Sequence, residues 1–96
     1  MNLRHIEFVV AVAAERSFSR AAERCHVTQP ALSNGVSLLE TELGGQLFVR
    51  TTRKVDLSPF GERMLPMIEG LYRSHQELKT GAPAFYECFL YSGPCP

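Results

Sequence analysis

Residues 17–43, SFSRAAERCHVTQPALSNGVSLLETEL, decide the fold of this chain. The stretch holds a short helical segment with the adjacent alanines Ala21 and Ala22, a brief break, and a second, longer helical segment. Two helices joined by so short a turn can place one polar helix face in a DNA groove. The stretch therefore predicts a helix-turn-helix, with the recognition surface on its second helix.

Capping residues mark the ends of both helical segments. Ser19 is placed to cap the first helix, which is predicted to end near Cys25, and Thr28 is placed to cap the second. Pro30 lies in the first turn of the second helix, where its missing backbone N–H leaves no hydrogen bond unmade. An inward-facing apolar stripe follows at helical spacing, made of Leu32, Val36, Leu39 and Leu43.

The other face of the second helix is small, neutral and rich in hydrogen-bonding groups. It consists of Gln29, Ser33, Asn34 and Ser37, and none of these is a bulky apolar side chain. Glutamine and asparagine can pair with an adenine edge in the major groove. This face is the predicted base-reading surface.

Amphipathic and β-compatible segments flank the helix pair. Apolar residues at helical spacing predict a first helix over residues 3–16. Farther along the chain, the runs QLFVR and VDLS surround the polar segment TTRK. These runs predict a β-hairpin whose tip carries Arg53 and Lys54.

A long helix is predicted over residues 59–79, with Ser58 as its N-cap and Pro59 in its first turn. Its apolar stripe consists of Phe60, Met64, Ile68, Leu71 and Leu78. Nothing behind the helix in sequence offers a large surface to cover that stripe, so we expect the helix to pair with a second copy of the chain. The proline-containing residues 80–96 are expected to be irregular.

The formal charge of the chain is zero, with ten basic and ten acidic residues. The basic residues nevertheless gather in two places, one with Arg16, Arg20 and Arg24 and the other with Arg50, Arg53 and Lys54. Clusters of this kind can bind phosphate even in a chain without net charge. For the first cluster, an ordinary solvated helix face explains the arginines nearly as well as phosphate binding does.

The sequence lacks the residue sets that carry catalysis or bind metals. It contains no paired carboxylates, Ser/His/Asp set, glycine-rich phosphate loop or metal-ligand spacing, so we expect no enzyme, no metal and no cofactor. Cys25 is expected to be an inert core thiol although His26 adjoins it. Without an export signal or a membrane-length apolar run, the chain is expected to be soluble and cytoplasmic, with no membrane partner.

In their order, these elements resemble the N-terminal DNA-binding domain of the LysR-type transcriptional regulators. The segments LRHIEFVVAVAAERSFSRAAERCHVTQPALS and LLETELGGQLFVRTTRKVDLSPFGERML carry a resemblance that covers residues 1–79. It implies a mainly α fold, with a winged helix-turn-helix of three helices and a β-hairpin wing over residues 1–58 and a dimerisation helix over residues 59–79. It also implies that a homodimer, or a higher oligomer in a full-length protein, binds double-stranded DNA at an inverted repeat upstream of a bacterial gene.

The resemblance assigns DNA contacts to particular residues. On the recognition helix these are Thr28, Gln29, Pro30 and Ser33, and the outward positions of Asn34 and Ser37 add those two side chains. On the wing they are Arg50, Thr51, Arg53 and Lys54. The stripe Phe60, Met64, Ile68, Leu71 and Leu78 is the corresponding dimer interface.

Three features depart from the family pattern. Asn34 and Gly35 stand where a long basic or amide pair is common, and Ser37 stands where another basic residue is common, so we expect weaker base readout. Family members continue into a domain that binds a small-molecule inducer, but residues 80–96 do not match its start. No inducer site is therefore expected in this chain, and a natural truncation, a frameshift or vector sequence would each explain such an ending.

Two functions fit these features. The first is the DNA-binding domain of a bacterial regulator. The alternative is a protein-interaction fragment whose long helix forms mixed dimers with a full-length regulator and so removes it from DNA. The altered middle of the recognition helix and the zero net charge slightly favour the alternative, and DNA binding distinguishes the two.

Overall fold

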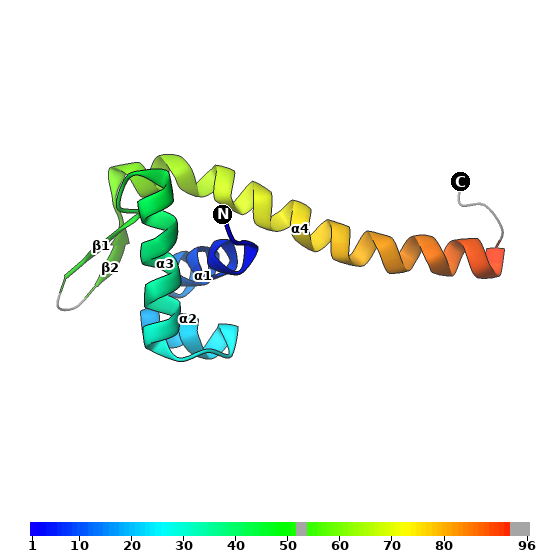
Figure 1. Ribbon diagram of the computed structural model, residues 1–96, viewed down its shortest axis with the longest axis horizontal. Coiled ribbons are helices and arrows are strands. Elements are labelled where there is room, and N and C mark those ends of the chain that lie inside the picture. The colour runs from blue at the N-terminus through cyan, green and yellow to red at the C-terminus, as the bar shows by residue number, and fades with distance from the viewer. Residues whose placement is uncertain (52–53, 93–96) are drawn as a thin grey trace.

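Figure 1 shows a computed structural model of the chain, which describes residues 1–51 and 54–92, with residues 82–92 described by their backbone alone. Along these residues the elements are α1 (Leu3–Glu15), α2 (Phe18–Cys25), α3 (Gln29–Leu43), β1 (Phe48–Arg50), β2 (Val55–Leu57) and α4 (Pro59–Ser92). The helices α1 to α3 and the β-hairpin form a head, from which α4 projects (Figure 1). This order confirms the predicted winged helix-turn-helix followed by a long helix.

Short connections follow α1, α2 and α3 because the residue after each helix turns the chain sharply. Arg16, His26 and Gly44 have φ values of 54°, 58° and 83°, all in the left-handed region. The backbone N–H of each donates to a carbonyl in the preceding turn, as at Arg16, whose N–H donates to Val12 at 2.8 Å. The next element can therefore start within a few residues, a helix after Arg16 and His26 and strand β1 after Gly44.

Ser17 caps α2, and the predicted cap at Ser19 is wrong. Ser17 has an extended backbone, and its hydroxyl accepts a hydrogen bond from the backbone N–H of Arg20 at 3.2 Å. Phe18, the first residue of α2, is buried in the core. Either serine hydroxyl could cap the helix. A cap at Ser17 makes Phe18 the first residue of α2, and this start of the helix accompanies the burial of the Phe18 side chain in the core.

The core lies where α1, α2, α3 and the start of the hairpin meet. The predicted stripe of α3 is confirmed, since Leu32, Val36 and Leu39 are fully buried and Leu43 is partly buried against them. The side chains packed around these three come from the other elements, and they include Ile6, Val9, Val12, Ala21, Ala22, Cys25, Leu47 and Phe48. This core fixes the direction in which the polar face of α3 points.

Gly35 belongs to the contact between α3 and α1 and not to the outward face. It is buried, and a Cβ atom at this position would lie 2.7 Å from the Phe8 ring. A side chain at position 35 would therefore point into α1. The predicted weakening of base readout therefore rests on Asn34 and Ser37 and not on Gly35, since a residue at position 35 would face the core.

The start of α4 is fastened to the hairpin, and the predicted cap at Ser58 is confirmed. Its hydroxyl accepts from the backbone N–H of Gly61 at 2.8 Å and donates to the carbonyl of Gln46. Its backbone N–H donates to the carbonyl of Leu47 at 2.9 Å. Gly61 is required here because a Cβ atom would lie 2.0 Å from the Leu47 carbonyl oxygen.

α4 is longer than predicted, since it continues past Lys79 to Ser92. Residues 80–92 are therefore helical and not irregular, and residues 93–96 lie outside the described part of the chain. Gly81 lies within the helix and lacks the positive φ that a glycine often adopts at a helix end. Among the described glycines, only Gly44 has a positive φ. The Thr80 hydroxyl also bonds the carbonyls of Gln76 and Glu77 within the helix, at 3.1 and 3.2 Å.

The first half of α4 covers α1, which corrects the predicted dimer stripe. Ile68 is 4% exposed and belongs to the core, and Phe60 and Met64 are partly buried against it. The order of the elements in the sequence suggested no surface against which these side chains could pack. The chain folds back, however, so that α4 packs against α1. Leu71 and Leu78, in contrast, are 48% and 72% exposed.

Candidate nucleic-acid interface

The first turn of α3 is fixed by its cap and open to solvent. The Thr28 hydroxyl accepts from the backbone N–H of Ala31 at 3.3 Å, which confirms the predicted cap, and Pro30 lies in the first turn. The predicted base-reading face lies on the surface, with Ser33 partly buried and Thr28, Gln29, Pro30, Asn34 and Ser37 exposed. These side chains come from a helix whose opposite face is locked in the core.

Arg50 links the wing to α3 and α2. Its guanidinium Nη2 donates to the Ser33 hydroxyl at 3.0 Å, and its Cζ atom lies 3.8 Å from the centroid of the Phe18 ring. Stacking on an aromatic face orients a guanidinium while leaving its outer N–H groups accessible. The last residue of β1 thus places a cation beside the polar face of α3.

The wing is a short antiparallel hairpin, as predicted. Its register pairs Phe48 with Leu57 and Arg50 with Val55. Beyond the paired residues, Thr51 closes the turn, since its N–H donates to the Lys54 carbonyl at 2.9 Å and its hydroxyl accepts from the Lys54 N–H at 3.1 Å. Thr51 and Lys54 are exposed, and the predicted wing residue Arg53 lies outside the described residues.

Two of the polar hollows beside α3 are also bordered by the wing. The first, of about 490 Å³, lies between α3 and β1, and its polar lining includes Ser33, Ser37, Glu40 and Arg50. The second, of about 340 Å³, opens between α2, α3 and the wing, and its lining includes Arg16, Ser17, Ser19, Gln29, Arg50, Thr51 and Lys54. Cations and hydroxyl groups therefore surround the start of α3, which suits an anionic polymer such as the DNA backbone.

The arginines before and within α2 are not a uniform basic face. Arg16 pairs with Asp56 of the wing at 3.0 Å, and Arg24 pairs with Glu15 at 3.4 Å. Arg20 is exposed and forms no ion pair with any residue that the structure describes. Arg50 and Lys54 of the wing likewise form no ion pair within the described part of the chain.

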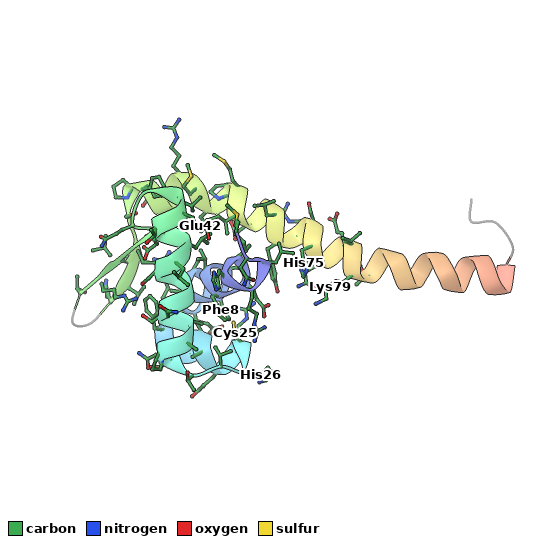
Figure 2. All side chains as sticks on the ribbon, viewed as in Figure 1. Phe8, Cys25, His26, Glu42, His75 and Lys79 are labelled. Carbon is green, nitrogen blue, oxygen red and sulfur yellow. The ribbon has the colours of Figure 1, made fainter. Side chains whose placement is uncertain are left out.

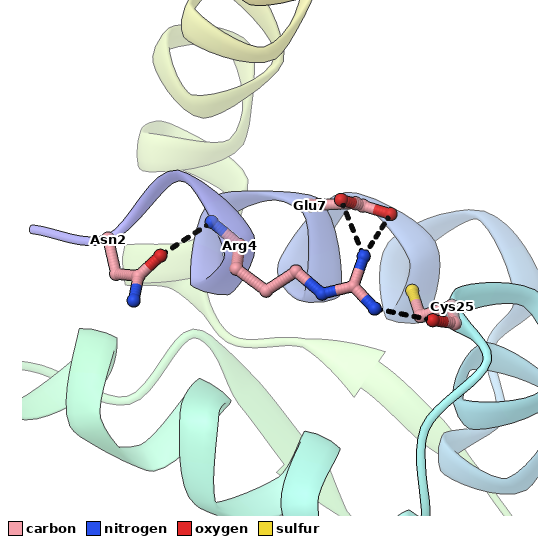
Figure 3. Close-up of polar contacts among 4 residues, drawn as sticks. All are labelled: Asn2, Arg4, Glu7 and Cys25. Atoms are coloured by element: carbon pink, nitrogen blue, oxygen red, sulfur yellow. Dashed lines mark hydrogen bonds and ion pairs between the residues drawn. The ribbon is translucent and has the colours of Figure 1, made fainter.

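Arg4 holds α1 to the end of α2, a role that the sequence did not indicate. Its guanidinium donates to both carboxylate oxygens of Glu7 at 3.1 Å and to the carbonyl of Cys25 at 2.7 Å, as Figure 3 shows. Its Cζ atom also lies 5.3 Å from the Phe8 ring centroid. A partner carbonyl so distant in sequence leaves no periodic signal, so only the fold reveals this contact.

Cys25 and His26 do not form a joint site. In Figure 2, Cys25 lies inside the head and His26 at its outer edge. Burial, and next the Glu7 carboxylate, raise the pKa of the Cys25 thiol, which is therefore neutral and a weak nucleophile.

Among the described helices, none has the length and hydropathy that crossing a bilayer would need.

The second helix of the helix-turn-helix is capped, has an exposed polar first turn and lies beside a hairpin that carries basic residues. This arrangement defines a winged helix-turn-helix of the DNA-binding class. The model of the family described as bacterial regulatory helix-turn-helix protein, lysR family, matches residues 3–62. This chain belongs to the LysR family and forms a DNA-binding domain of that type.

Curated relatives include the DNA-binding transcriptional dual regulator OxyR of Escherichia coli K12, which is 43% identical over 82 residues, 85% of this chain and 27% of the relative. A hydrogen peroxide-inducible genes activator from Dickeya chrysanthemi is 42% identical over 94 residues, 98% of this chain and 30% of the relative. The chain thus spans less than a third of the length of these relatives.

Solved structures resemble the chain over most of its length. A full-length OxyR variant from Pseudomonas aeruginosa is 42% identical with a TM-score of 0.81, and the match covers 88% of this chain and 28% of that one. The DNA-binding domain of BenM, solved with catB site 1 DNA, is 34% identical with a TM-score of 0.82, and the match covers 90% and 96% of the two chains.

Proposed function

We propose that this chain binds double-stranded DNA as a dimer at an inverted repeat near a bacterial promoter and so regulates transcription. The observation that carries the proposal is the exposed first turn of α3 beside Arg50 and Lys54. The similarity to the BenM DNA-binding domain, whose structure contains DNA, supports it. Regulation in place of catalysis is supported by the names of the relatives, and access to the bacterial chromosome requires a cytoplasmic location.

Two kinds of DNA contact follow from the placement of the side chains. Gln29 and Asn34 lie on the exposed face of α3 and can bond base edges in the major groove, while the hydroxyls of Thr28 and Ser33 suit phosphate. Lys54, with the other wing residues Arg50, Thr51 and Arg53, would bind phosphates or enter the adjoining minor groove. In this proposal α3 supplies sequence preference and the wing supplies affinity.

The proposed dimer uses the exposed apolar side of α4. Met67, Leu71 and Leu78 are 60%, 48% and 72% exposed, and their spacing places them along one side of the helix. This surface replaces the stripe expected from the sequence, since Ile68 is occupied by the core of its own chain. A partner helix would cover these three side chains and bring two copies of α3 into one dimer, as binding to two half-sites requires.

An electrophoretic mobility shift experiment tests the proposal against the alternative of a protein-interaction fragment. The probes are duplexes that carry an AT-rich inverted repeat, at several salt concentrations. DNA binding predicts a shift at low salt and a log–log salt slope of about −0.9 per phosphate contacted. Absence of any shift at low salt would contradict the proposal and favour the mixed-dimer function.

A further inference from the structure

A side chain of α2 contacts the first residue of the recognition helix. The Ser19 hydroxyl donates a hydrogen bond to Oε1 of Gln29 at 2.9 Å. Both residues are exposed and line the second polar hollow beside α3. Ser19 is free to make this contact because Ser17 provides the helix cap.

The backbone of Gln29 is fixed while its side chain has little else to hold it. The Thr28 cap and the Pro30 ring set the helix start, so the position from which the Gln29 side chain leaves α3 is constant. A glutamine side chain on a surface samples several rotamers, and ordering it opposes binding. The Ser19 hydroxyl restricts this freedom before any ligand arrives.

We propose that Ser19 is a positioning residue that sets the sequence preference of α3 by holding the Gln29 amide in its base-reading orientation. The inference rests on the proposed DNA binding and extends it to a residue outside the recognition helix. Ser19 itself need not touch DNA, because its effect passes through Gln29.

The contact is compatible with bidentate reading of adenine. A carbonyl oxygen has two lone pairs, so Oε1 can accept from Ser19 and from the N6 amine of adenine together. The amide nitrogen of Gln29 then donates to adenine N7. Without the hydroxyl, the amide can rotate and present its donor and acceptor to other bases, so preference should weaken more than total affinity.

The test uses duplexes that the wild-type chain selects from a random-sequence library, and single-base-pair variants of them. Dissociation constants are measured by fluorescence anisotropy for wild type, Ser19→Ala, Ser19→Thr, Gln29→Ala and the Ser19→Ala, Gln29→Ala double variant. Thr80→Ala, which removes an exposed hydroxyl on α4, is the matched control. Alanine is a good helix former, so Ser19→Ala is expected to fold.

Ser19→Ala is expected to reduce discrimination about three- to tenfold, the range of a single hydrogen bond, at the base pair where Gln29→Ala acts. It should add nothing in the Gln29→Ala background, Ser19→Thr should retain the preference, and Thr80→Ala should change nothing. Additive effects, uniform weakening on every duplex, or an unchanged preference would each overturn the positioning role while leaving DNA binding intact. Failure of the wild type to bind any duplex would instead overturn the proposed function and this inference with it.

Discussion

Arg50 of the wing lies over the ring of Phe18 at the start of α2, with its Cζ atom 3.8 Å from the ring centroid. The same guanidinium bonds Ser33 of α3. One side chain therefore connects the two helices of the helix-turn-helix to the hairpin, and it does so beside the proposed DNA surface. We therefore expect this contact to set the angle between the wing and the recognition helix.

Replacing Arg50 should loosen the wing. Arg50→Ala is expected to lower the free energy of unfolding by about 1 kcal/mol, since a cation–π contact at an exposed site is worth about 0.5–1 kcal/mol and one hydrogen bond is also lost. Arg50→Lys keeps the charge but lacks the planar guanidinium group that stacks on the Phe18 ring, so it should recover little of this stability. Urea denaturation measures both, and equal stability of Arg50→Lys and wild type would contradict the role assigned to the stacking.

Two glycines of α4 should respond oppositely to alanine. Gly61→Ala places a Cβ atom 2.0 Å from the Leu47 carbonyl oxygen and is expected to destabilise the fold by about 1–3 kcal/mol or more. Gly70 has open space around its Cα atom, so Gly70→Ala should stabilise α4 by up to about 1 kcal/mol. Thermal unfolding of the two variants is the measurement, and a tolerated Gly61→Ala would show that α4 does not meet the hairpin so closely.

Leu71→Asp should break the proposed dimer without unfolding the head. Leu71 is half exposed in the single chain, and a charge there is tolerated in water but not in an apolar helix seam. Light scattering should report a monomer with an unchanged circular dichroism spectrum. The matched variant Ile68→Asp should unfold the protein, because Ile68 is a core residue. A Leu71→Asp chain that remains dimeric would move the interface elsewhere.

Cys25 should make stability fall at high pH. Burial raises the pKa of its thiol above the ordinary value of 9.0, so the folded state keeps a proton that the unfolded chain releases. The contribution of the protonated Cys25 thiol to the free energy of unfolding is fully present below pH 9 and is lost as the pH rises through the pKa of the folded state. Denaturation of wild type and of Cys25→Ala from pH 7 to 10.5 isolates the contribution of the thiol, since all other titratable groups are present in both proteins. Parallel pH curves for the two chains would contradict a buried neutral thiol.

Local sequence signals predicted the parts of the site that local chemistry determines. Thr28 caps α3 and Leu32, Val36 and Leu39 turn inward, so the direction of the polar face followed from capping and helical spacing. The hairpin also followed, since two β-compatible runs flank its turn. These features depend on residues only a few positions apart.

Features that depend on distant residues could not be predicted in this way. The choice of Ser17 over Ser19 as a cap depends on the burial of Phe18, and the burial of Ile68 depends on α4 folding back over α1. The contacts of Arg50 with Phe18 and Ser33 join separate elements and leave no periodic pattern. The end of α4 was misplaced because the prolines of residues 80–96 indicated an irregular tail, whereas the helix continues through Pro83 to Ser92.

The most direct test of the account is the binding of wild type, Gln29→Ala and Lys54→Ala to selected duplexes and their single-base-pair variants at several salt concentrations. If α3 reads bases and the wing binds phosphate, Gln29→Ala will relax the preference at one base pair of each half-site. Lys54→Ala will then weaken binding to every duplex alike and reduce the salt slope by about one unit. Uniform loss of affinity in both variants, with the preference unchanged, would contradict the division of roles between recognition helix and wing.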